Sequence, residues 1–346
     1  MIIPQQKLKE MLAYEAFIRR AALLDMPFML KGSYITRQYF QNPTDRIPAD
    51  LDWVYLEKIS DPDDARIPFG QWVTDITEMK IDDGVVFRSF EENAFWRMID
   101  YAMDDDFPTV STDIKCWVDG EEMKDFILDI SFNLDIDVPP VPLQYQPIRG
   151  THFMIPNTVP LALQVSWKLH QTLVRPRFKD LFDLIHLVQH PGFNEAVLHQ
   201  TLLALVNECS VDGTDVYNLN YLLSDQLENL FVGKDINQLW DFWRYGKQNM
   251  VEKPFYDSNL TYVFSKAEYL TDVLKLPETL AAFRELFSTT LKANGFDENL
   301  LNNLPEPTNA PHFFSPDDDF VMISEYKPPK PVKPLSFMER IRRLFR

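Results

Sequence analysis

The hydrophobic pattern of this chain changes near Pro160, and that change constrains the fold more than any other feature of its 346 residues. Before Pro160, short apolar runs that alternate like strands lie between segments with helical spacing. After it, almost every patterned segment has apolar residues three or four positions apart, as helices do. No internal repeat is present. The sequence therefore predicts an α+β fold, with a mixed β-sheet flanked by helices and then an all-helical domain.

Four or five strands are expected in the first 150 residues. Residues 28–30 form an apolar run that leads through a glycine-containing turn at 31–33 into a helical stretch ending at Phe40. Residues 50–55 alternate in polarity as a strand does, and Asp119-Gly120 between two β-patterned runs predicts a hairpin. This part should therefore contain a strand–turn–helix unit, a second strand and a hairpin.

The remaining expected elements are helices. Three prolines, at positions 139, 140 and 142, mark the expected end of the strands. Helices are predicted at residues 5–25, 70–80, 91–103, 161–174, 178–189, 194–208, 217–231, 235–249 and 277–293. Three parts are expected: residues 1–150, the helical residues 151–304, and a tail at 305–346.

The predicted tail is a proline-rich spacer followed by a basic segment. KPPKPVKP favours polyproline II, and the final LSFMERIRRLFR is typical of a short basic amphipathic helix. That helix could dock on the acidic body of its own chain, on a partner or on an anionic membrane surface. No run of 18 apolar residues and no signal peptide are found, and we expect a cytoplasmic protein without a transmembrane segment.

The charge is strongly negative and uneven. The chain has 34 Lys and Arg against 52 Asp and Glu, a net charge of −18. Residues 327–346 alone carry +6, so residues 1–326 carry −24. Such a body repels nucleic acid over most of its surface, and any phosphate chemistry needs a divalent metal or a local basic pocket. The sequence contains neither GxGxxG nor GxxxxGK[ST], which argues against a Rossmann dehydrogenase and a P-loop enzyme.

Three aspartates are candidate metal ligands. In an extended strand Asp50 and Asp52 point to the same face, and two parallel carboxylates repel each other unless a cation such as Mg²⁺ lies between them. Asp129 interrupts an otherwise apolar strand, where a charge is costly unless it is paired or binds a ligand. The alternative is that the DxD pair is a solvated pair in an acidic protein.

Two other features fit phosphate binding. Lys31-Gly32-Ser33 lies at a strand-to-helix turn, where free backbone N–H groups attract phosphate, although Ser33 could equally be an ordinary N-cap. Lys168 lies on an apolar helix, and Arg175, Arg177 and Lys179 form a basic knot around Pro176. The alternative for these basic residues is internal ion pairing with Asp180 and Asp183.

The remaining candidate residues indicate packing roles or support no particular chemistry. His186 and His190 have helical i, i+4 spacing, but no third metal ligand follows at a recognisable distance. Trp240, Phe242 and Trp243 could stack on bases, yet a helical core is the expected role. Neither Cys116 nor Cys209 has a nearby histidine, so nucleophilic hydrolase chemistry is unsupported and a reducing compartment is expected.

Four segments together resemble the nucleotidyltransferases of the AbiEii/AbiGii toxin family, in the DNA polymerase β-like superfamily. They are FMLKGSYITRQYF, ADLDWVY, LDIS and LALQVSWKLHQTLVRPRFKDLFDLIHL, which lie between residues 28 and 187. Sixteen residues separate Ser33 from Asp50, more than the family's motif usually has. The resemblance implies that residues 1–150 are a nucleotidyltransferase domain and that residues 151–304 contribute nucleotide-phosphate contacts.

The resemblance also implies roles for individual residues. Asp50, Asp52 and Asp129 would be catalytic and bind two Mg²⁺ ions, and Asp180 matches a family position that is catalytic or orients the basic groups. The nucleotide-binding residues would be Lys31, Gly32, Ser33, Lys168, Arg175, Arg177 and Lys179.

The expected reaction transfers a nucleoside monophosphate from an NTP to an acceptor hydroxyl, with RNA or tRNA as the expected acceptor. The resemblance alone suggests the toxin of a toxin–antitoxin or abortive-infection system with a cognate antitoxin. Two alternatives are open: transfer to a protein or small molecule, and a degenerate nucleotide-binding module that works through partners.

Overall fold

The computed structural model describes residues 3, 5–48, 50–60, 62–99, 108–136, 138–245 and 276–308. They belong to one compact unit that extends to residue 309. The basic tail expected at the C-terminus lies outside the described residues, as does the end of the helix expected at 235–249. No helix in the described ranges is long and apolar enough to cross a membrane.

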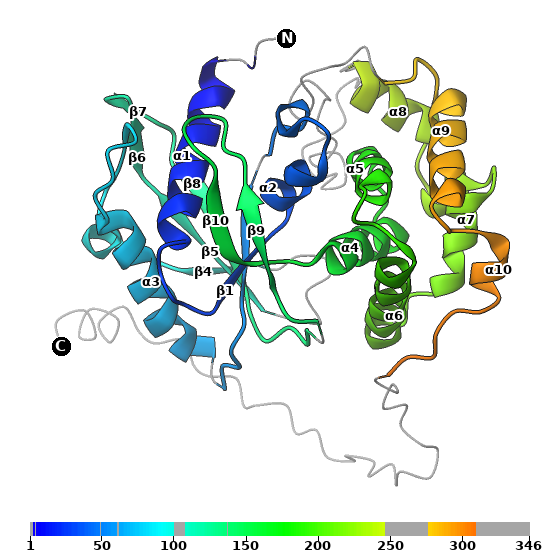
Figure 1. Cartoon of the computed structure of the whole chain (residues 1–346), viewed down its shortest axis with the longest axis horizontal. Coiled ribbons are helices and arrows are strands. Elements are labelled where there is room, and N and C mark those ends of the chain that lie inside the picture. Colours follow the sequence, from blue (N-terminus) through cyan, green and yellow to red (C-terminus); the bar gives the residue numbers. More distant parts are fainter. Residues whose placement is uncertain are drawn as a thin grey trace, which may run out of the picture. The chain divides into compact units, whose positions relative to one another are not determined.

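A mixed β-sheet lies at the centre of the N-terminal part of this unit (Figure 1). β1 pairs in parallel with β10 and antiparallel with β2, while β2 pairs in parallel with β8. Across the described sheet the order of its seven strands is β4-β5-β8-β2-β1-β10-β9. The bounds are β1 Phe28–Lys31, β2 Leu51–Tyr55, β4 Arg97–Ile99, β5 Thr109–Ile114, β8 Phe126–Ser131, β9 Val141–Tyr145 and β10 Phe153–Thr158. The predicted mixed sheet is confirmed.

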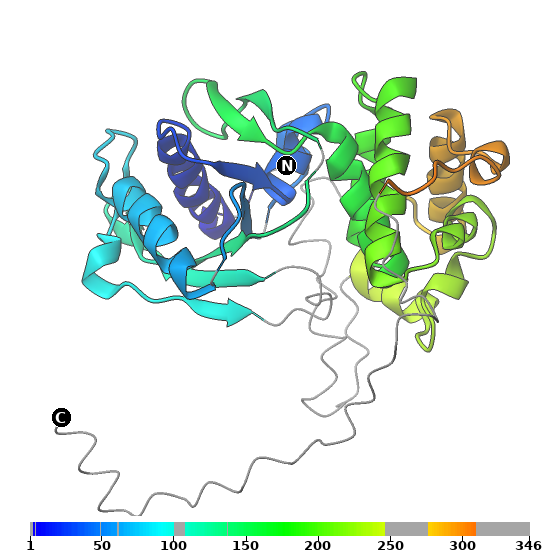
Figure 2. The same cartoon turned by 90° about the horizontal axis from the view of Figure 1, so that it is seen from below.

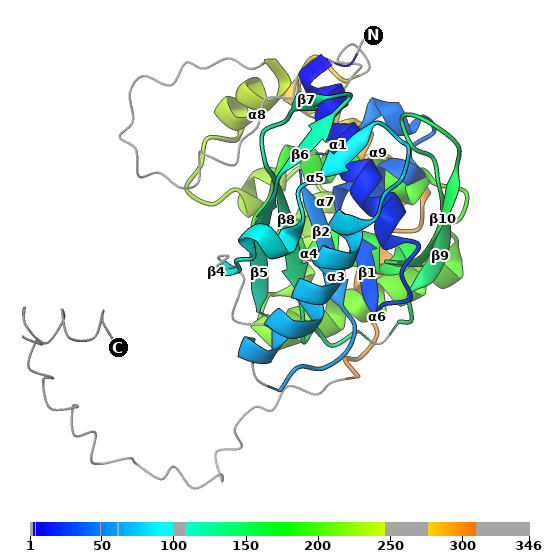
Figure 3. The same ribbon diagram turned by 90° about the vertical axis from the view of Figure 1, so that its left-hand side faces the viewer.

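Helices α1 (Gln5–Ala21) and α3 (Arg66–Glu78) cover one face of the sheet, as Figures 1 and 3 show. Trp72 of α3 stacks on Phe28 of β1 with ring centroids 3.9 Å apart and meets Trp53 of β2 at 5.0 Å. Because successive strand side chains alternate between faces, Asp52 points to the opposite side. The aromatic packing on one face therefore determines which face carries the carboxylates.

A second, three-stranded sheet contains β3 (Val85–Phe87), β6 (Cys116–Val118) and β7 (Glu121–Glu122). Asp119 and Gly120 join β6 to β7 with φ of 51° and 83°. Two successive positive φ angles are those of a type I′ hairpin turn. The hairpin predicted from Asp119-Gly120 is confirmed.

The chain after Thr158 is helical in its described parts, and its helices lie together beside the sheet (Figure 2). They bury a separate hydrophobic core, in which Phe178 packs against Phe231, Trp240, Trp243 and Phe283. Trp240 and Trp243 are thus core residues, as expected. The helices are α4 Leu161–Val174, α5 Phe178–Gln189, α6 Glu195–Asp212, α7 Leu219–Leu223, α8 Ile236–Tyr245, α9 Leu280–Ala293 and α10 Glu298–Leu301.

Three expectations about the strands were wrong. Among the described residues, nine strands, β1 to β9, lie within residues 1–150, where four or five were expected. Residues 91–103 were expected to be helical, but they contain the end of the 3₁₀ turn η4 (Phe90–Asn93) and strand β4. The non-local pairing of β4 with β5, reinforced by two hydrogen bonds from Arg97 to Asp113, overrides the local helical pattern. Strands were also expected to end at the prolines, yet β9 contains Pro142 and β10 comes after it. β9 is an edge strand of the sheet, where the missing N–H of Pro142 is tolerated.

Candidate active site

The carboxylate face of the sheet gathers residues from three neighbouring strands. Lys31 of β1 is paired in register with Asp52 of β2, and Asp52 with Asp129 of β8. On β8, Phe126 packs on Phe17 of α1, so Asp129 points away from that helix to the same face as Asp52. The strand alternation predicted for Asp52 and Asp129 therefore places them on one face.

The glycine–serine turn packs directly against these carboxylates. Gly32 has a φ of +75°, and a Cβ atom at this position would collide with the carboxylate of Asp52. Ser33 Oγ lies 3.2 Å from Asp50 Oδ1 and 3.3 Å from the backbone oxygen of Asp50, as a donor to both. Only glycine satisfies both the backbone angle and the close approach. The sixteen residues between Ser33 and Asp50 include the end of α2 (Ser33–Thr36) and the 3₁₀ turns η1 (Arg37–Tyr39) and η2 (Pro43–Asp45).

Negative charge accumulates at this face. The pKa of Asp52 is raised to about 7, first by burial and then by the neighbouring charge of Asp50, with a further contribution from Asp129. Lys31 and Lys179 act in the opposite direction on the same carboxyl without cancelling the shift. Carboxylate oxygens whose negative charges repel one another suit a hard divalent cation. The described residues nevertheless contain no preassembled group of three His, Cys, Asp or Glu side chains around one point.

Next to this carboxylate face, helices α4 and α5 carry a buried chain of ion pairs. Lys168 Nζ lies 2.8 Å from Asp183 Oδ2 and 3.2 Å from Asp180 Oδ1. Arg177 Nε lies 2.5 Å from the other oxygen of Asp180. These contacts lower the pKa of Asp180, with Arg177 as the strongest favourable neighbour and Lys168 next, against the effect of burial. Lys168 and Arg177 thus make the internal ion pairs that the sequence left open as an alternative.

Lys179 connects the ion-pair chain to the carboxylate face. Burial and the nearby charge of Arg177 lower the pKa of Lys179, while Asp180 and Asp50 raise it. The charge of Lys179 in turn lowers the pKa of Asp52. Arg175, the last of the predicted basic residues, is half-buried at the C-terminus of α4. The basic knot therefore borders the carboxylates through Lys179.

A family model described as "Nucleotidyl transferase AbiEii toxin, Type IV TA system" matches residues 17–249. The chain belongs to this AbiEii nucleotidyltransferase family. The resemblance seen in the four sequence segments is confirmed, and the chain is accordingly a nucleotidyltransferase.

Solved structures give a weaker likeness. A candidate nucleotidyltransferase from H. pylori has 14% identity and a TM-score of 0.38, over 86% of this chain and 99% of that one. MenT4, a nucleotidyltransferase toxin from Mycobacterium tuberculosis H37Rv, has 13% identity and a TM-score of 0.40, over 83% of this chain and 87% of its own. No curated protein matches the sequence.

Two residues near the site of this AbiEii-family chain were not singled out by the sequence. Arg46 donates from Nε and Nη2 to the two carboxylate oxygens of Asp183, at 2.7 and 3.1 Å. Gln164 of α4 donates to Thr36 Oγ1 at 2.6 Å and to the backbone oxygen of Gly32 at 3.3 Å. The available signal for Arg46 was an arginine four positions before the DxD pair in a strongly acidic chain.

His186 and His190 have packing roles. His186 stacks on Phe40 with ring centroids 4.0 Å apart, and His190 meets Tyr39 edge-on at 5.0 Å. His190 Nδ1 also accepts a hydrogen bond of 3.0 Å from the backbone N–H of Gly192. These contacts join α5 to the segment after β1.

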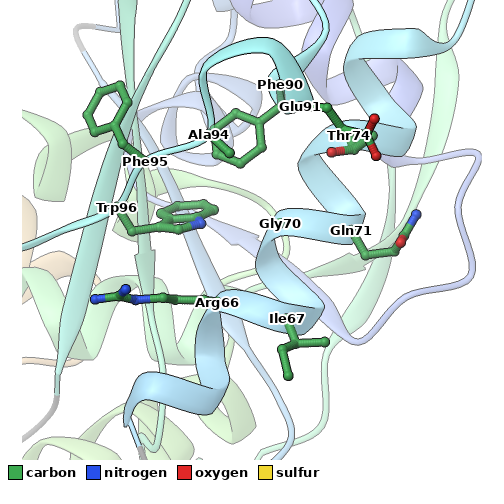
Figure 4. Close-up of a pocket in the computed structure, with 10 residues that line it drawn as sticks. All are labelled: Arg66, Ile67, Gly70, Gln71, Thr74, Phe90, Glu91, Ala94, Phe95 and Trp96. Carbon is green, nitrogen blue, oxygen red and sulfur yellow. The ribbon is translucent and has the colours of Figure 1, made fainter. Parts of the chain in front are cut away.

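A cavity of about 380 Å³ lies elsewhere, between α3 and η4 (Figure 4). Phe90, Phe95 and Trp96 line one side of it and Gly70 of α3 lies at its wall. Because α3 covers the face opposite Asp52, this cavity is not part of the carboxylate site. Its lining is completed by Arg66, Ile67, Gln71, Thr74, Glu91 and Ala94.

Proposed function

We propose that this nucleotidyltransferase transfers a nucleoside monophosphate from an NTP to an acceptor hydroxyl. The acceptor oxygen forms a bond to the α-phosphorus, the bond between that phosphorus and the bridging oxygen breaks, and pyrophosphate leaves. The proton of the hydroxyl passes to a carboxylate of the site. Asp129 is the carboxylate proposed for this step because it lies beside Asp52 on the neighbouring strand.

One observation carries the proposal: Asp52 lies against a glycine turn while Asp50 and Asp129 raise its pKa. A folded chain keeps such repelling charges together only where another requirement, such as ligand binding, demands it. Backbone N–H groups at Gly32 and Ser33 suit the β- and γ-phosphates.

Asp50 and Asp52 would hold Mg²⁺, with Asp129 as the third carboxylate, and phosphate oxygens would complete the coordination. When bound, two such ions would stabilise the charge on the α-phosphate and on the leaving group. Ser33 already orients Asp50 through its hydroxyl. Lys31 and Lys179 would add positive charge beside the triphosphate.

Residues 151–304, which are helical in their described part after Thr158, would act as a second domain that carries phosphate-binding charge. Among the basic residues of this part, Arg175 and Lys179 are proposed to contact the phosphates directly. Lys168 and Arg177 would contribute through the ion-pair chain, because two carboxylates already hold Lys168. Asp180 would orient these basic groups, since it accepts from both Lys168 and Arg177.

For the acceptor we propose RNA, with tRNA as the first candidate, in a toxin that acts with a cognate antitoxin against phage infection in the cytoplasm. The net charge of −24 over residues 1–326 keeps a protein or small-molecule acceptor open as a second candidate. It argues for recognition of a short local segment of RNA rather than of a long duplex.

The test is transfer of radiolabel. Purified full chain is incubated with each of the four α-³²P-labelled NTPs, Mg²⁺, total RNA and RNA-depleted cell extract. Label in RNA supports the first acceptor, and label in protein or in a small molecule supports the second. Asp50→Asn and Asp52→Asn should abolish the label, whereas Asp75→Asn on α3 should retain it. Absence of label with all four nucleotides, together with unchanged toxicity of Asp50→Ala in cells, would contradict the proposal.

A further inference from the structure

Arg46 is a deeply buried cation near the carboxylate site. Its side chain is 2% exposed, and that of its partner Asp183 on α5 is fully buried. The guanidinium donates two hydrogen bonds to Asp183, and Arg46 Nη1 donates a third of 2.6 Å to the backbone oxygen of Ile47. A two-pronged contact between planar groups fixes orientation as well as distance.

This pair joins segments that are 137 residues apart in the chain. Arg46 lies in the segment that leads from η2 into Asp50, and Asp183 lies on the second turn of α5. Removing two opposite charges from water offsets most of their attraction, so such a pair adds little net stability over well-packed apolar side chains. What it does supply is a single defined position of α5 relative to the segment before Asp50.

The geometry of α5 connects that position to the site. Lys179 and Asp183 are four residues apart on the same helix and therefore lie on the same face. Asp183 is held by Arg46 and also accepts a hydrogen bond of 2.8 Å from Lys168 of α4. Lys179 interacts electrostatically with Asp50 and Asp52. Arg46 in turn interacts electrostatically with Lys179. A shift of α5 along or about its axis would change the distance between Lys179 and these carboxylates.

We propose that Arg46 and Asp183 are positioning residues of the transferase site. Their ion pair, here called the Arg46–Asp183 clamp, holds α5 against the segment that carries Asp50 and so sets where Lys179 lies relative to Asp50 and Asp52. The inference rests on the proposed function. It adds two residues that touch neither the nucleotide nor the acceptor, and they act through Lys179 and Asp50.

Conservative variants give the first test. Arg46→Lys and Asp183→Glu keep both charges, but an ammonium cannot form the two-pronged contact and a longer carboxylate displaces the helix. We expect kcat to fall at least tenfold in both variants with KM for the NTP within about threefold, since misplacement affects the reacting geometry more than binding. The melting temperature should stay within a few degrees of wild type.

Arg20→Lys is the matched control. Arg20 makes the same two-pronged contact with Asp83, at 2.7 and 3.1 Å, and is 1% exposed. It lies on α1, on the other face of the sheet from Asp52. This variant should lower the melting temperature as much as Arg46→Lys does, or more, and leave kcat unchanged. A comparable loss of kcat in the control would mean that any weakened buried pair reduces activity, and would overturn the inference.

The double variant Arg46→Met with Asp183→Leu separates positioning from folding. Apolar side chains of similar size should keep the melting temperature near that of wild type. We expect kcat to remain about 100-fold low despite restored stability. Wild-type kcat in this variant, or in both conservative variants, would show that the clamp only supports folding.

Binding of Mn²⁺, followed by electron paramagnetic resonance, gives a readout that does not depend on catalysis. Displacement of Asp50 should weaken Mn²⁺ binding severalfold in Arg46→Lys and Asp183→Glu, and leave it unchanged in Arg20→Lys. If wild type transfers no nucleotide, the proposed function fails, while a changed Mn²⁺ affinity still supports the clamp. If wild type is active and neither kcat nor Mn²⁺ affinity changes in the two variants, the clamp alone is wrong.

Discussion

Two sets of buried aspartates in this molecule have pKa values shifted in opposite directions. On the sheet, burial and the charges of Asp50 and Asp129 raise the pKa of Asp52 to about 7. On α5, Arg46 and then Lys168 lower the pKa of Asp183 against the effect of burial. The difference lies in the neighbours, since the strongest charged neighbour of Asp52 is the carboxylate of Asp50 and that of Asp183 is the guanidinium of Arg46. Carboxylates that are neutralised internally hold the fold together, and carboxylates that are left repelling one another are available for a ligand.

The largest expected effect is a loss of nucleotide transfer when an aspartate on the sheet is replaced. Asp52→Asn should reduce nucleotide transfer about 10³-fold or more, because interactions with metal-bound phosphates contribute several kcal/mol to the transition state. The same change removes a repelled charge, so the melting temperature should equal or exceed that of wild type. Activity assays and thermal melts of the same preparation measure both. A variant that loses activity by unfolding would contradict the division between the two sets.

Substitution of an aspartate on α5 should instead reduce the stability of the protein. Asp183→Asn leaves Arg46 buried with a neutral partner, which should cost about 3–5 kcal/mol of unfolding free energy. Chemical denaturation measures this loss. The control is Asp135→Asn, whose partner Lys58 is 64% exposed, and it should change stability by less than about 1 kcal/mol. Similar losses in the two variants would mean that burial of the pair makes no difference.

Two glycines sharpen the contrast between the site and the opposite face. Gly32→Ala meets both the positive φ and the carboxylate of Asp52, so stability should fall by about 1–2 kcal/mol from the backbone angle alone and activity should fall with it. Gly70 lies within α3, and nothing lies within 4 Å of the position that a Cβ would take. Gly70→Ala should therefore stabilise the protein by about 0.5–1 kcal/mol with unchanged activity. Denaturation curves and transfer assays of both variants decide this.

The last comparison is the dependence of stability on pH. Asp180 and Asp183 have lower pKa values folded than unfolded, so they stabilise the fold above their unfolded pKa of about 3.9 and lose that contribution as pH falls toward the folded values. Each such group contributes a slope of about 1.4 kcal/mol per pH unit in that window.

The raised pKa of Glu15, caused by burial, acts in the opposite direction, because its contribution declines as pH rises above about 4.5. The variant with Arg46→Met and Asp183→Leu lacks the carboxyl group of Asp183. It should therefore lose less stability than wild type when the pH falls from 4 to 2.5. Equal acid sensitivity of wild type and variant in denaturation at these two pH values would show that the lowered pKa of Asp183 does not contribute.

The sequence predicted the local parts of the fold and of the candidate site well. The helices at 161–174 and 178–189 coincide with α4 and α5, because apolar residues at helical spacing report directly on a buried helix face. The shared face of Asp52 and Asp129 follows from strand alternation. Strand β4 was missed because its extended conformation depends on pairing with β5, 10 to 14 residues further along the chain, and the local pattern does not contain that pairing.

The sequence by itself determined which chemical groups this protein has: two aspartates on strands and a third just before one of them, a glycine turn that admits no side chain, and a basic knot in an acidic chain. Periods of two and of three to four residues reveal such features because they are local. Only the tertiary structure decided which charges neutralise one another. Asp183 pairs with Arg46, 137 residues away, whereas the strongest charged neighbour of Asp52 is another carboxylate, that of Asp50. Electrostatic interaction depends on distance in space, and a sequence does not contain that distance.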